Sequence, residues 1–194
     1  AVADLSGNGC ADIVFCQNQT ADSYTTESFV YRGKKAGVEN VPVRLTTEDA
    51  RRALIGRPSP AGDPQVVFVN HYSREIKGDV KAYVYPGSAE GFSPDRRLEI
   101  PAWGAVEAIC CDIDDNGRID VALANASENS VLDDPGSFVV LQEPDGFPDT
   151  PTWTMPTRRA HGVCCADLNR DGYLDLVFCG FDNDEITIFY GAAD

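Results

Sequence analysis

The sequence repeats itself with a period of about 55 residues, and this repeat limits the possible folds more than any other feature. Three gap-free copies of one loop-and-strand segment start at Asp4, Asp112 and Asp167. The second and third copies start 55 residues apart, and the first lies two periods before the second. A degenerate copy over 57–68 keeps the glycine and the apolar strand. Its residues Arg57, Ser59, Ala61 and Gln65 replace the oxygen-rich side chains of the other copies. Regular self-similarity of this length indicates a repeat architecture.

Each period predicts four short strands, bounded by Gly, Pro, Asp and Asn. One strand precedes the loop, where Ala50, Ala105 and Ala160 occupy equivalent positions, and three follow it. Four strands in about 50 residues are typical of propeller blades. We therefore expect an all-β fold of about four four-stranded blades in an incomplete β-propeller. The repeats form one array with approximate bounds 1–49, 50–104, 105–159 and 160–194, the last being partial. The segment 46–55 is expected to be strand or turn rather than helix.

The loops have the pattern D-x-[DSN]-x-[DN]-G-x-x-D, which places oxygen side chains at positions 1, 3, 5 and 9. Gly at position 6 allows a sharp turn, and the backbone carbonyl at position 7 can also face inward. Several oxygens on a short loop favour Ca²⁺. An EF-hand is excluded, because position 12 holds Phe15, Leu123 or Phe178 instead of Glu. Metal-free Asx turns are the alternative, but three such loops in register favour calcium.

In these loops and in the Gly-Phe and aromatic strand elements, the chain resembles the FG-GAP/VCBS repeat family, which includes the integrin α-subunit propeller. The resemblance implies calcium at up to three sites and covers essentially the whole chain. Its implied ligands are Asp4, Ser6, Asn8, the Cys10 carbonyl and Asp12 in the first loop; Asp112, Asp114, Asn116, the Arg118 carbonyl and Asp120 in the second; and Asp167, Asn169, Asp171, the Tyr173 carbonyl and Asp175 in the third. The first loop has the lowest formal charge and is expected to bind most weakly. The degenerate copy is expected to bind no ion.

The composition is strongly acidic, with 31 Asp and Glu against 16 Lys and Arg and a net charge of −15. Such a surface repels phosphate backbones, which argues against a nucleic-acid partner. The longest apolar runs are far shorter than the roughly 18 residues of a membrane helix, so we expect no membrane insertion.

These features predict a non-catalytic, calcium-binding propeller segment that is extracellular, on the cell surface or periplasmic. Its expected partners are a protein or glycan ligand, or further chains that complete the propeller. The sequence contains none of the common catalytic motifs, and His71 and His161 are interpreted as polar loop or strand-entry residues. One alternative is a propeller domain of a secreted carbohydrate-active enzyme such as a polysaccharide lyase, for which the pairs at 96–97 and 158–159 are the available arginines. Another is a structural subunit of a surface assembly.

Two further expectations concern the cysteines and the ends of the array. The seven cysteines form no Cys-x-x-Cys pattern and alternate with Val, Ile and Ala at repeat positions, so we expect them to fill buried space on strands. The first repeat is expected to lack its leading strand and the last to lack its final one. An open arc exposes two sheet edges, so we expect strands from elsewhere to complete the final blade.

Overall fold

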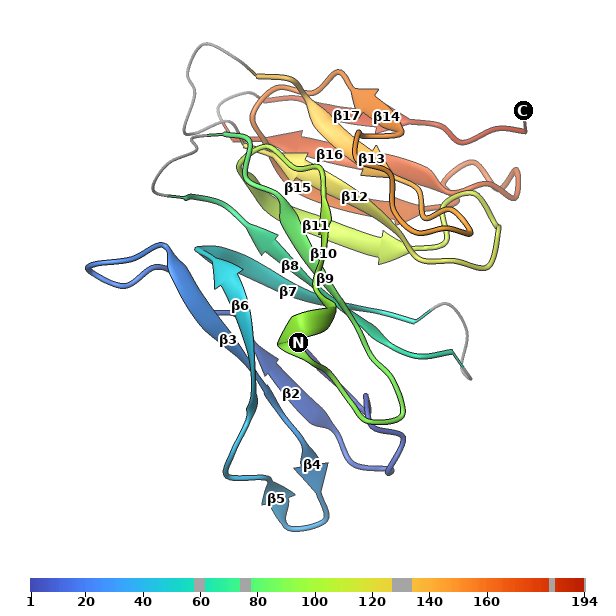
Figure 1. Ribbon diagram of the computed structural model, residues 1–194. Helices are drawn as coiled ribbons and strands as arrows, with labels where there is room; N and C mark the ends of the chain where they lie inside the picture. Colours follow the sequence, from blue (N-terminus) through green and yellow to red (C-terminus); the bar gives the residue numbers. More distant parts are fainter. Residues whose placement is uncertain (58–61, 74–77, 127–133, 182–183, 194) are drawn as a thin grey trace.

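The computed structural model describes residues 1–57, 62–73, 78–126, 134–181 and 184–193, and these residues form an all-β structure. Four antiparallel sheets follow one another in chain order, each packed face to face on the next (Figure 1). Within the described ranges, the one helical segment is a 3₁₀ turn, η1 (Pro94–Arg96). The predicted fold class of successive propeller blades, without closure into a ring, is confirmed.

The sheets are called blades 1 to 4. Blade 1 contains β1 (Val2–Ala3), β2 (Asp12–Phe15), β3 (Thr25–Tyr31) and β6 (Val43–Glu48). Blade 2 contains β7 (Ala50–Gly56), β8 (Gln65–Asn70), β9 (Ala82–Pro86) and β10 (Leu98–Ile100). Blade 3 contains β11 (Ala105–Cys111), β12 (Asp120–Asn125), β13 (Ser137–Val140) and β14 (Trp153–Met155). Blade 4 contains β15 (Ala160–Ala166), β16 (Asp175–Gly180) and β17 (Ile186–Phe189).

Two details of blade 1 differ from the sequence-based expectation. Its leading strand was expected to be missing, but the two residues of β1 pair with β2, joining Val2 to Ile13 and Ala3 to Asp12. The expectation was wrong because two residues are too few to show a strand pattern. A short hairpin of β4 (Gly33–Lys34) and β5 (Gly37–Val38), which we did not predict, lies between β3 and β6. The segment 46–55 lies mostly in β6 and β7, so the strand interpretation is confirmed.

Each blade has two unlike faces, because successive residues of a strand point to opposite sides of the sheet. We call the side toward the preceding blade the front face and the side toward the following blade the back face. In blade 2 the front face carries two paired rows, Val66 with Tyr85 and Phe68 with Tyr83, which pack on blade 1. The back face carries Val67, Val69, Ala82 and Val84, which pack on blade 3. Every internal interface thus joins a back face to a front face.

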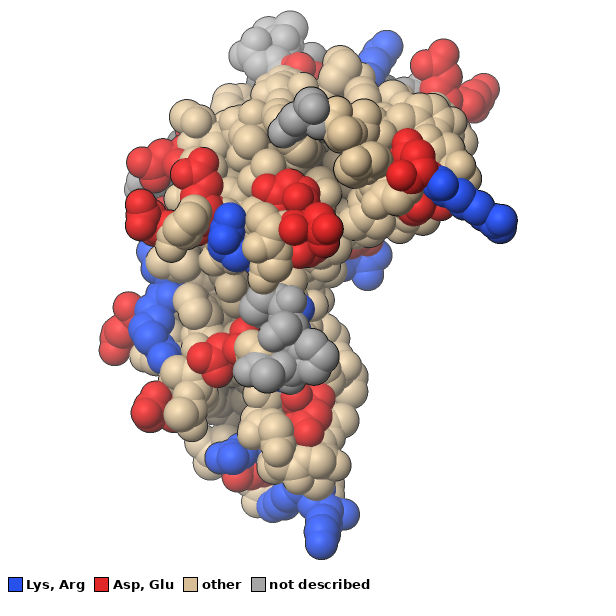
Figure 2. All heavy atoms as spheres, turned by 90° about the vertical axis from the view of Figure 1, so that its right-hand side faces the viewer, with Lys and Arg blue, Asp and Glu red and all other residues tan. Residues whose placement is uncertain are grey.

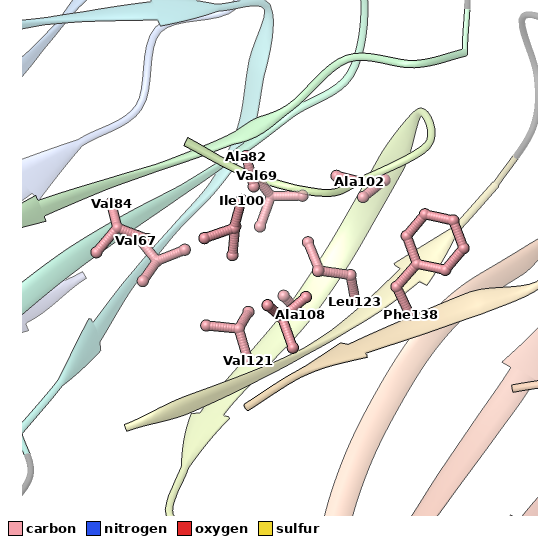
Figure 3. Packing of buried hydrophobic residues seen from close by; sticks show 12 residues of the cluster. Val67, Val69, Ala82, Val84, Ile100, Ala102, Ala108, Val121, Leu123 and Phe138 are labelled. Atoms are coloured by element: carbon pink, nitrogen blue, oxygen red, sulfur yellow. The ribbon is translucent and has the colours of Figure 1, made fainter. Parts of the chain in front are cut away.

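The interface between blades 2 and 3 shows this packing directly (Figure 3). Val67 and Val84 of blade 2 face Val121 of blade 3, and Leu123 and Phe138 continue the cluster. The four aliphatic residues are fully buried and Phe138 is nearly so. Burying apolar area contributes roughly 25 cal/mol per Å², so neighbouring blades stabilise each other, as expected for a repeat array.

The start of each leading strand has the same irregular backbone in blades 2 to 4. The residue before the strand has positive φ, 43° at Asp49, 54° at Gly104 and 42° at Arg159. One residue later a buried alanine begins the strand, and a β-bulge follows it in each blade. A bulge bends its strand and increases its twist. The repeated positive φ and bulge therefore set the same entry geometry for each of these strands.

The cysteines follow the predicted pattern only in part. Burial raises the pKa of the Cys110 thiol to about 12, and the sulfurs of Cys111 and Cys165 lie 3.5 Å apart between blades 3 and 4. Cys164 and Cys179 are exposed, which contradicts the expectation that the cysteines fill buried space. Both lie on the back face of blade 4, which no other described blade covers. Their strand positions were read correctly, but among the described residues no blade covers this face.

Candidate metal centre

The three acidic loops occupy the same place in their blades. Each connects the leading strand to the second strand, as β1 to β2, β11 to β12 and β15 to β16. The second strand begins at position 9 of its loop, at Asp12, Asp120 or Asp175. The repeat therefore places three equivalent oxygen-rich loops at the same end of their sheets.

The carboxylate at position 9 is buried and ties the loop to the third strand of its blade. In the second loop, Asp120 Oδ2 accepts a hydrogen bond from the Ile113 amide at 2.7 Å, and Oδ1 accepts one from the Gln142 amide at 2.8 Å. Asp12 is bonded equivalently to the amides of Leu5, Ser6 and Gly33, and Asp175 to those of Leu168 and Gly191. This tie to the third strand was not predicted from the sequence. The signal in the sequence that could have predicted this tie is the glycine that follows the third strand in three of the blades, Gly33, Gly87 and Gly191.

Blade 3 has Gln142 at this position, whereas blades 1, 2 and 4 have glycine, and there two backbone segments approach each other closely. A Cβ on Gly191 would lie 2.6 Å from the Leu174 carbonyl oxygen, and one on Gly87 would lie 2.7 Å from the Pro64 oxygen. Contacts this short are not tolerated by a side-chain carbon. The third strand can therefore approach the loop closely enough for its amide to reach the carboxylate at position 9.

Positions 1 and 5 shape the turn. The carboxylate at position 1 accepts the amides of positions 5 and 6; in the second loop, Asp112 binds the amides of Asn116 and Gly117 at 2.9 and 2.7 Å. The side-chain oxygen at position 5 accepts a hydrogen bond from the amide of position 7, and Asn116 Oδ1 accepts the Arg118 amide at 2.8 Å. The first and third loops repeat both arrangements. These are the Asx-turn bonds of the metal-free alternative, and they fix the oxygens before any ion binds.

The second loop has the donor set that best fits a cation. Oxygens of Asp112, Asp114 and Asp120 lie within 4.8 Å of one another. Three carboxylates in such a small space suit a hard divalent cation. Burial raises the pKa of Asp120 to about 6, and the nearby charges of Asp114 and Asp112 add to the rise, while the two backbone hydrogen bonds oppose it. A bound cation would relieve the repulsion between these carboxylates.

The first and third loops are less concentrated in charge. The first contains two carboxylates, Asp4 and Asp12, and its other predicted side-chain ligands are Ser6 and Asn8. The third contains three, but Asp167, Asp171 and Asp175 are not among the described acidic groups whose oxygens all lie within 4.8 Å. Instead, the Asn169 amide nitrogen donates to Asp171 at 2.7 Å. The predicted carbonyl ligands Cys10, Arg118 and Tyr173 remain predictions, as does the full ligand set of each loop.

In the degenerate copy a guanidinium group lies where the loop begins. Arg57 at position 1 donates from Nη1 to the Gly62 carbonyl at 2.8 Å and from Nη2 to the Asp4 carbonyl at 3.0 Å. The second contact reaches the neighbouring blade. Residues 58–61 of this copy, including Ser59 and Ala61, lie outside the described residues. A fixed positive charge thus bridges backbone oxygens of blades 1 and 2.

A cavity of about 360 Å³ opens beside this arginine, between the first loop and blade 2. Its wall includes Arg32 and Arg57 as well as Asp12, Asp63 and Glu90. Because both signs of charge line it, the cavity favours neither an anionic nor a cationic ligand.

The comparisons with known proteins agree with this reading of the repeats. A family model described as an FG-GAP-like repeat matches residues 112–178. The match runs from the first residue of the second loop, through β12, β13 and β14 of blade 3, to strand β16 after the third loop. The comparison with curated proteins found no match. Residues 112–178 are therefore similar to an FG-GAP-like repeat, and the loop and strand pairing of this stretch recur in the other blades that the structure describes.

Proposed function

We propose that this chain is a non-catalytic, calcium-binding propeller module that binds a protein or glycan outside the cell, or serves there as a scaffold. The observation that carries the proposal is the group of three carboxylates of Asp112, Asp114 and Asp120 on a loop already shaped by its own hydrogen bonds. Calcium at millimolar concentration is available outside cells, so a loop with low calcium affinity can still be occupied in an extracellular module. Within the described residues, no helix is long and apolar enough to cross a membrane.

Calcium would act on this module through stability. Without an ion, the carboxylates of a loop repel one another at neutral pH. An ion that binds only the folded state stabilises it by roughly 2.7 kcal/mol per site at a hundredfold excess over Kd. The folded state of the module would therefore be most stable where the calcium concentration is high.

Calcium titration by calorimetry tests the proposal, with two variants of the second loop. Asp112→Asn removes a ligand charge, and losing a charged contact of about 1.5–3 kcal/mol lowers affinity by roughly tenfold or more. Asp115→Asn is the matched control, because it makes the same charge change in the same loop at a residue outside the carboxylate group. Asp115 has φ 56°, a conformation that Asn tolerates. We expect Asp112→Asn to weaken one site and Asp115→Asn to leave it nearly unchanged. Absence of binding by the unmodified chain at millimolar calcium would contradict the proposal.

The carbohydrate-active alternative receives no comparable support from the first of its two arginine pairs, residues 96–97. Arg97 lies over the Tyr83 ring, 4.4 Å from its centroid, and pairs with Glu99 at 2.7 Å. Arg96 donates to the Gly91 carbonyl. Both side chains therefore hold blade 2 together, and we propose no catalytic role for them.

A further inference from the structure

Two cysteines of different blades face each other at the interface between blades 3 and 4. Cys111 is the last residue of β11 and Cys165 the last but one of β15, and their Sγ atoms lie 3.5 Å apart. β11 and β15 are the leading strands of their blades and lie side by side (Figure 1). The two residues are 54 positions apart in the sequence, so the stacking of the blades brings their sulfurs together.

Strand geometry directs one sulfur of each Cys-Cys dipeptide into this interface. Successive residues of a strand point to opposite sides of the sheet, so Cys111 lies on the back face of blade 3 and Cys110 on its front face. Cys110 packs on the cluster between blades 2 and 3, and Cys165 on the cluster between blades 3 and 4. Cys164 is exposed on the back face of blade 4. Both sequence neighbours therefore point away from the pair.

The other two interfaces have the same arrangement without a second thiol. Where blades 2 and 3 meet, Gly56 takes the repeat position of Cys111, and a Cβ on Gly56 would lie 3.5 Å from the Cys110 Cβ. Where blades 1 and 2 meet, the equivalent residues are Ala3 and Ile55, which pack on the cluster between these blades. The repeat thus brings these two positions together at each interface, and the interface of blades 3 and 4 has cysteine at both.

We propose that Cys111 and Cys165 are a site of disulfide formation that joins blades 3 and 4 covalently in oxidising surroundings. The proposal rests on the proposed function only for its compartment, since disulfides persist outside the cell. A disulfide bond is about 2.05 Å long, so the two sulfurs must approach each other by roughly 1.5 Å. Rotation about the two χ1 angles supplies a displacement of this size.

Thiol–disulfide exchange with a small-molecule disulfide supplies the oxidant. One cysteine loses its proton, and its thiolate attacks a sulfur of that disulfide, whose S–S bond breaks and releases one small thiolate. The other cysteine loses its proton, and its thiolate attacks the protein sulfur of the mixed disulfide, which releases the second small thiolate. The two released thiolates take up the two protons. Two protein thiols are oxidised to one disulfide, and the small disulfide is reduced by two electrons to two thiols.

The cross-link holds two acidic loops in a fixed relation. Cys111 directly precedes Asp112, the first residue of the second loop, and Cys165 lies two residues before Asp167, the first residue of the third. A cross-link between residues far apart in the sequence constrains the unfolded chain and stabilises the folded one. We therefore expect oxidation to stabilise the association of blade 4 with blade 3.

Oxidation of the folded chain, followed by peptide mass spectrometry without reduction, tests the proposal. Acidic side chains gather on the upper half of the molecule in Figure 2, at the height at which Figure 1 places blades 3 and 4. They repel an anionic oxidant, so the probe is the uncharged hydroxyethyl disulfide. The reduced chain is treated with it in EDTA, and the remaining thiols are alkylated. We expect the peptides that contain Cys111 and Cys165 to be linked within one chain, with the loss of two hydrogen atoms.

Serine variants identify the linked sulfurs, because each cysteine of the pair has a cysteine beside it in the sequence. Cys111→Ser and Cys165→Ser should each abolish the link. Cys164→Ser is the matched control, since it makes the same replacement one residue away, at an exposed side chain that points away from the pair. It should form the link as the unmodified chain does.

The denaturant midpoint gives a second readout. Oxidation should raise the midpoint of the unmodified chain and of Cys164→Ser, and leave that of Cys111→Ser unchanged. Absence of linked peptides in the unmodified chain would overturn the proposal, as would a link that persists in Cys111→Ser or Cys165→Ser. A link that leaves the midpoint unchanged would overturn the stabilising role of the cross-link. All measurements are made with chelator present, so failure here is distinct from failure of the calcium proposal.

Discussion

At position 9 of each intact loop, one carboxylate binds two separate parts of its blade. Asp120 is fully buried, and it accepts one amide from its own loop and one from the segment after β13. The same oxygens belong to the group that fits a cation. A single residue therefore supports both the blade and the proposed ion, and its protonation should affect both.

The pH dependence of stability follows from the raised pKa of Asp120, about 6, against roughly 3.9 in an unfolded chain. Without metal, the folded state favours the protonated acid. This contribution to stability is present below about pH 4 and is lost as the pH rises through 6. Calcium needs the carboxylate, so its contribution grows over the same range. We expect the difference in Tm between calcium and EDTA to increase from pH 5 to pH 7. A difference that stays constant across this range would contradict the assignment, and Asp112→Asn should reduce the difference.

At the scale of strands and loops, the features that could be predicted from the sequence are those that recur in several repeats. The loops and the strands behind them recur with the same residue types, so their positions could be read from three aligned copies. The positive φ before each leading strand could not, because Asp49, Gly104 and Arg159 share no side-chain chemistry. The hairpin β4–β5 was missed because it occurs in blade 1 alone among the described blades. The gathering of carboxylates in the second loop depends on side-chain geometry that the shared pattern does not reveal.

A buried asparagine at the end of the second strand joins neighbouring elements in blades 2 and 3. Asn125 accepts the Trp103 amide at 3.0 Å and donates to the Gly136 carbonyl at 2.7 Å, and Asn70 makes the equivalent contacts. Asn125→Ala should leave two backbone groups without these partners, at a cost of about 1–3 kcal/mol each. We expect a lower denaturant midpoint. Asn125→Asp keeps the acceptor but loses the donor, and comparison of the two variants separates the contacts. An unchanged midpoint for the alanine variant would show that the contacts contribute nothing to stability.

At the scale of the whole molecule, the position of a blade in the array decides which of its residues are covered. Cys110 lies where blade 3 meets its neighbours and has a pKa raised to about 12 by burial. Cys164 and Cys179 lie on the uncovered back face of blade 4. Cys179 and Val69 occupy equivalent strand positions, yet Val69 is fully buried against blade 3 and Cys179 is exposed, because no described blade covers the back face of blade 4.

This difference predicts the order in which the thiols react. A short pulse of alkylating reagent on the folded chain, followed by peptide mass spectrometry, should label Cys164 and Cys179 first. Cys110 is half-buried and its raised pKa suppresses thiolate formation, so it should react more slowly than these two. Equal labelling rates for Cys110 and Cys179 in the folded chain would contradict the burial assigned to them.

The arginine in blade 2 has a consequence for what such a blade requires in order to form. Blade 2 keeps four paired strands although its loop has no acidic residue at the ligand positions. The Gly87 amide bonds to the Pro64 carbonyl at 2.7 Å, in place of the carboxylate tie of the other blades. Arg57 brings a permanent positive charge to backbone oxygens of two blades. A repeat can therefore keep its four-stranded blade without the acidic ligand positions, so the blade does not depend on an ion for its formation.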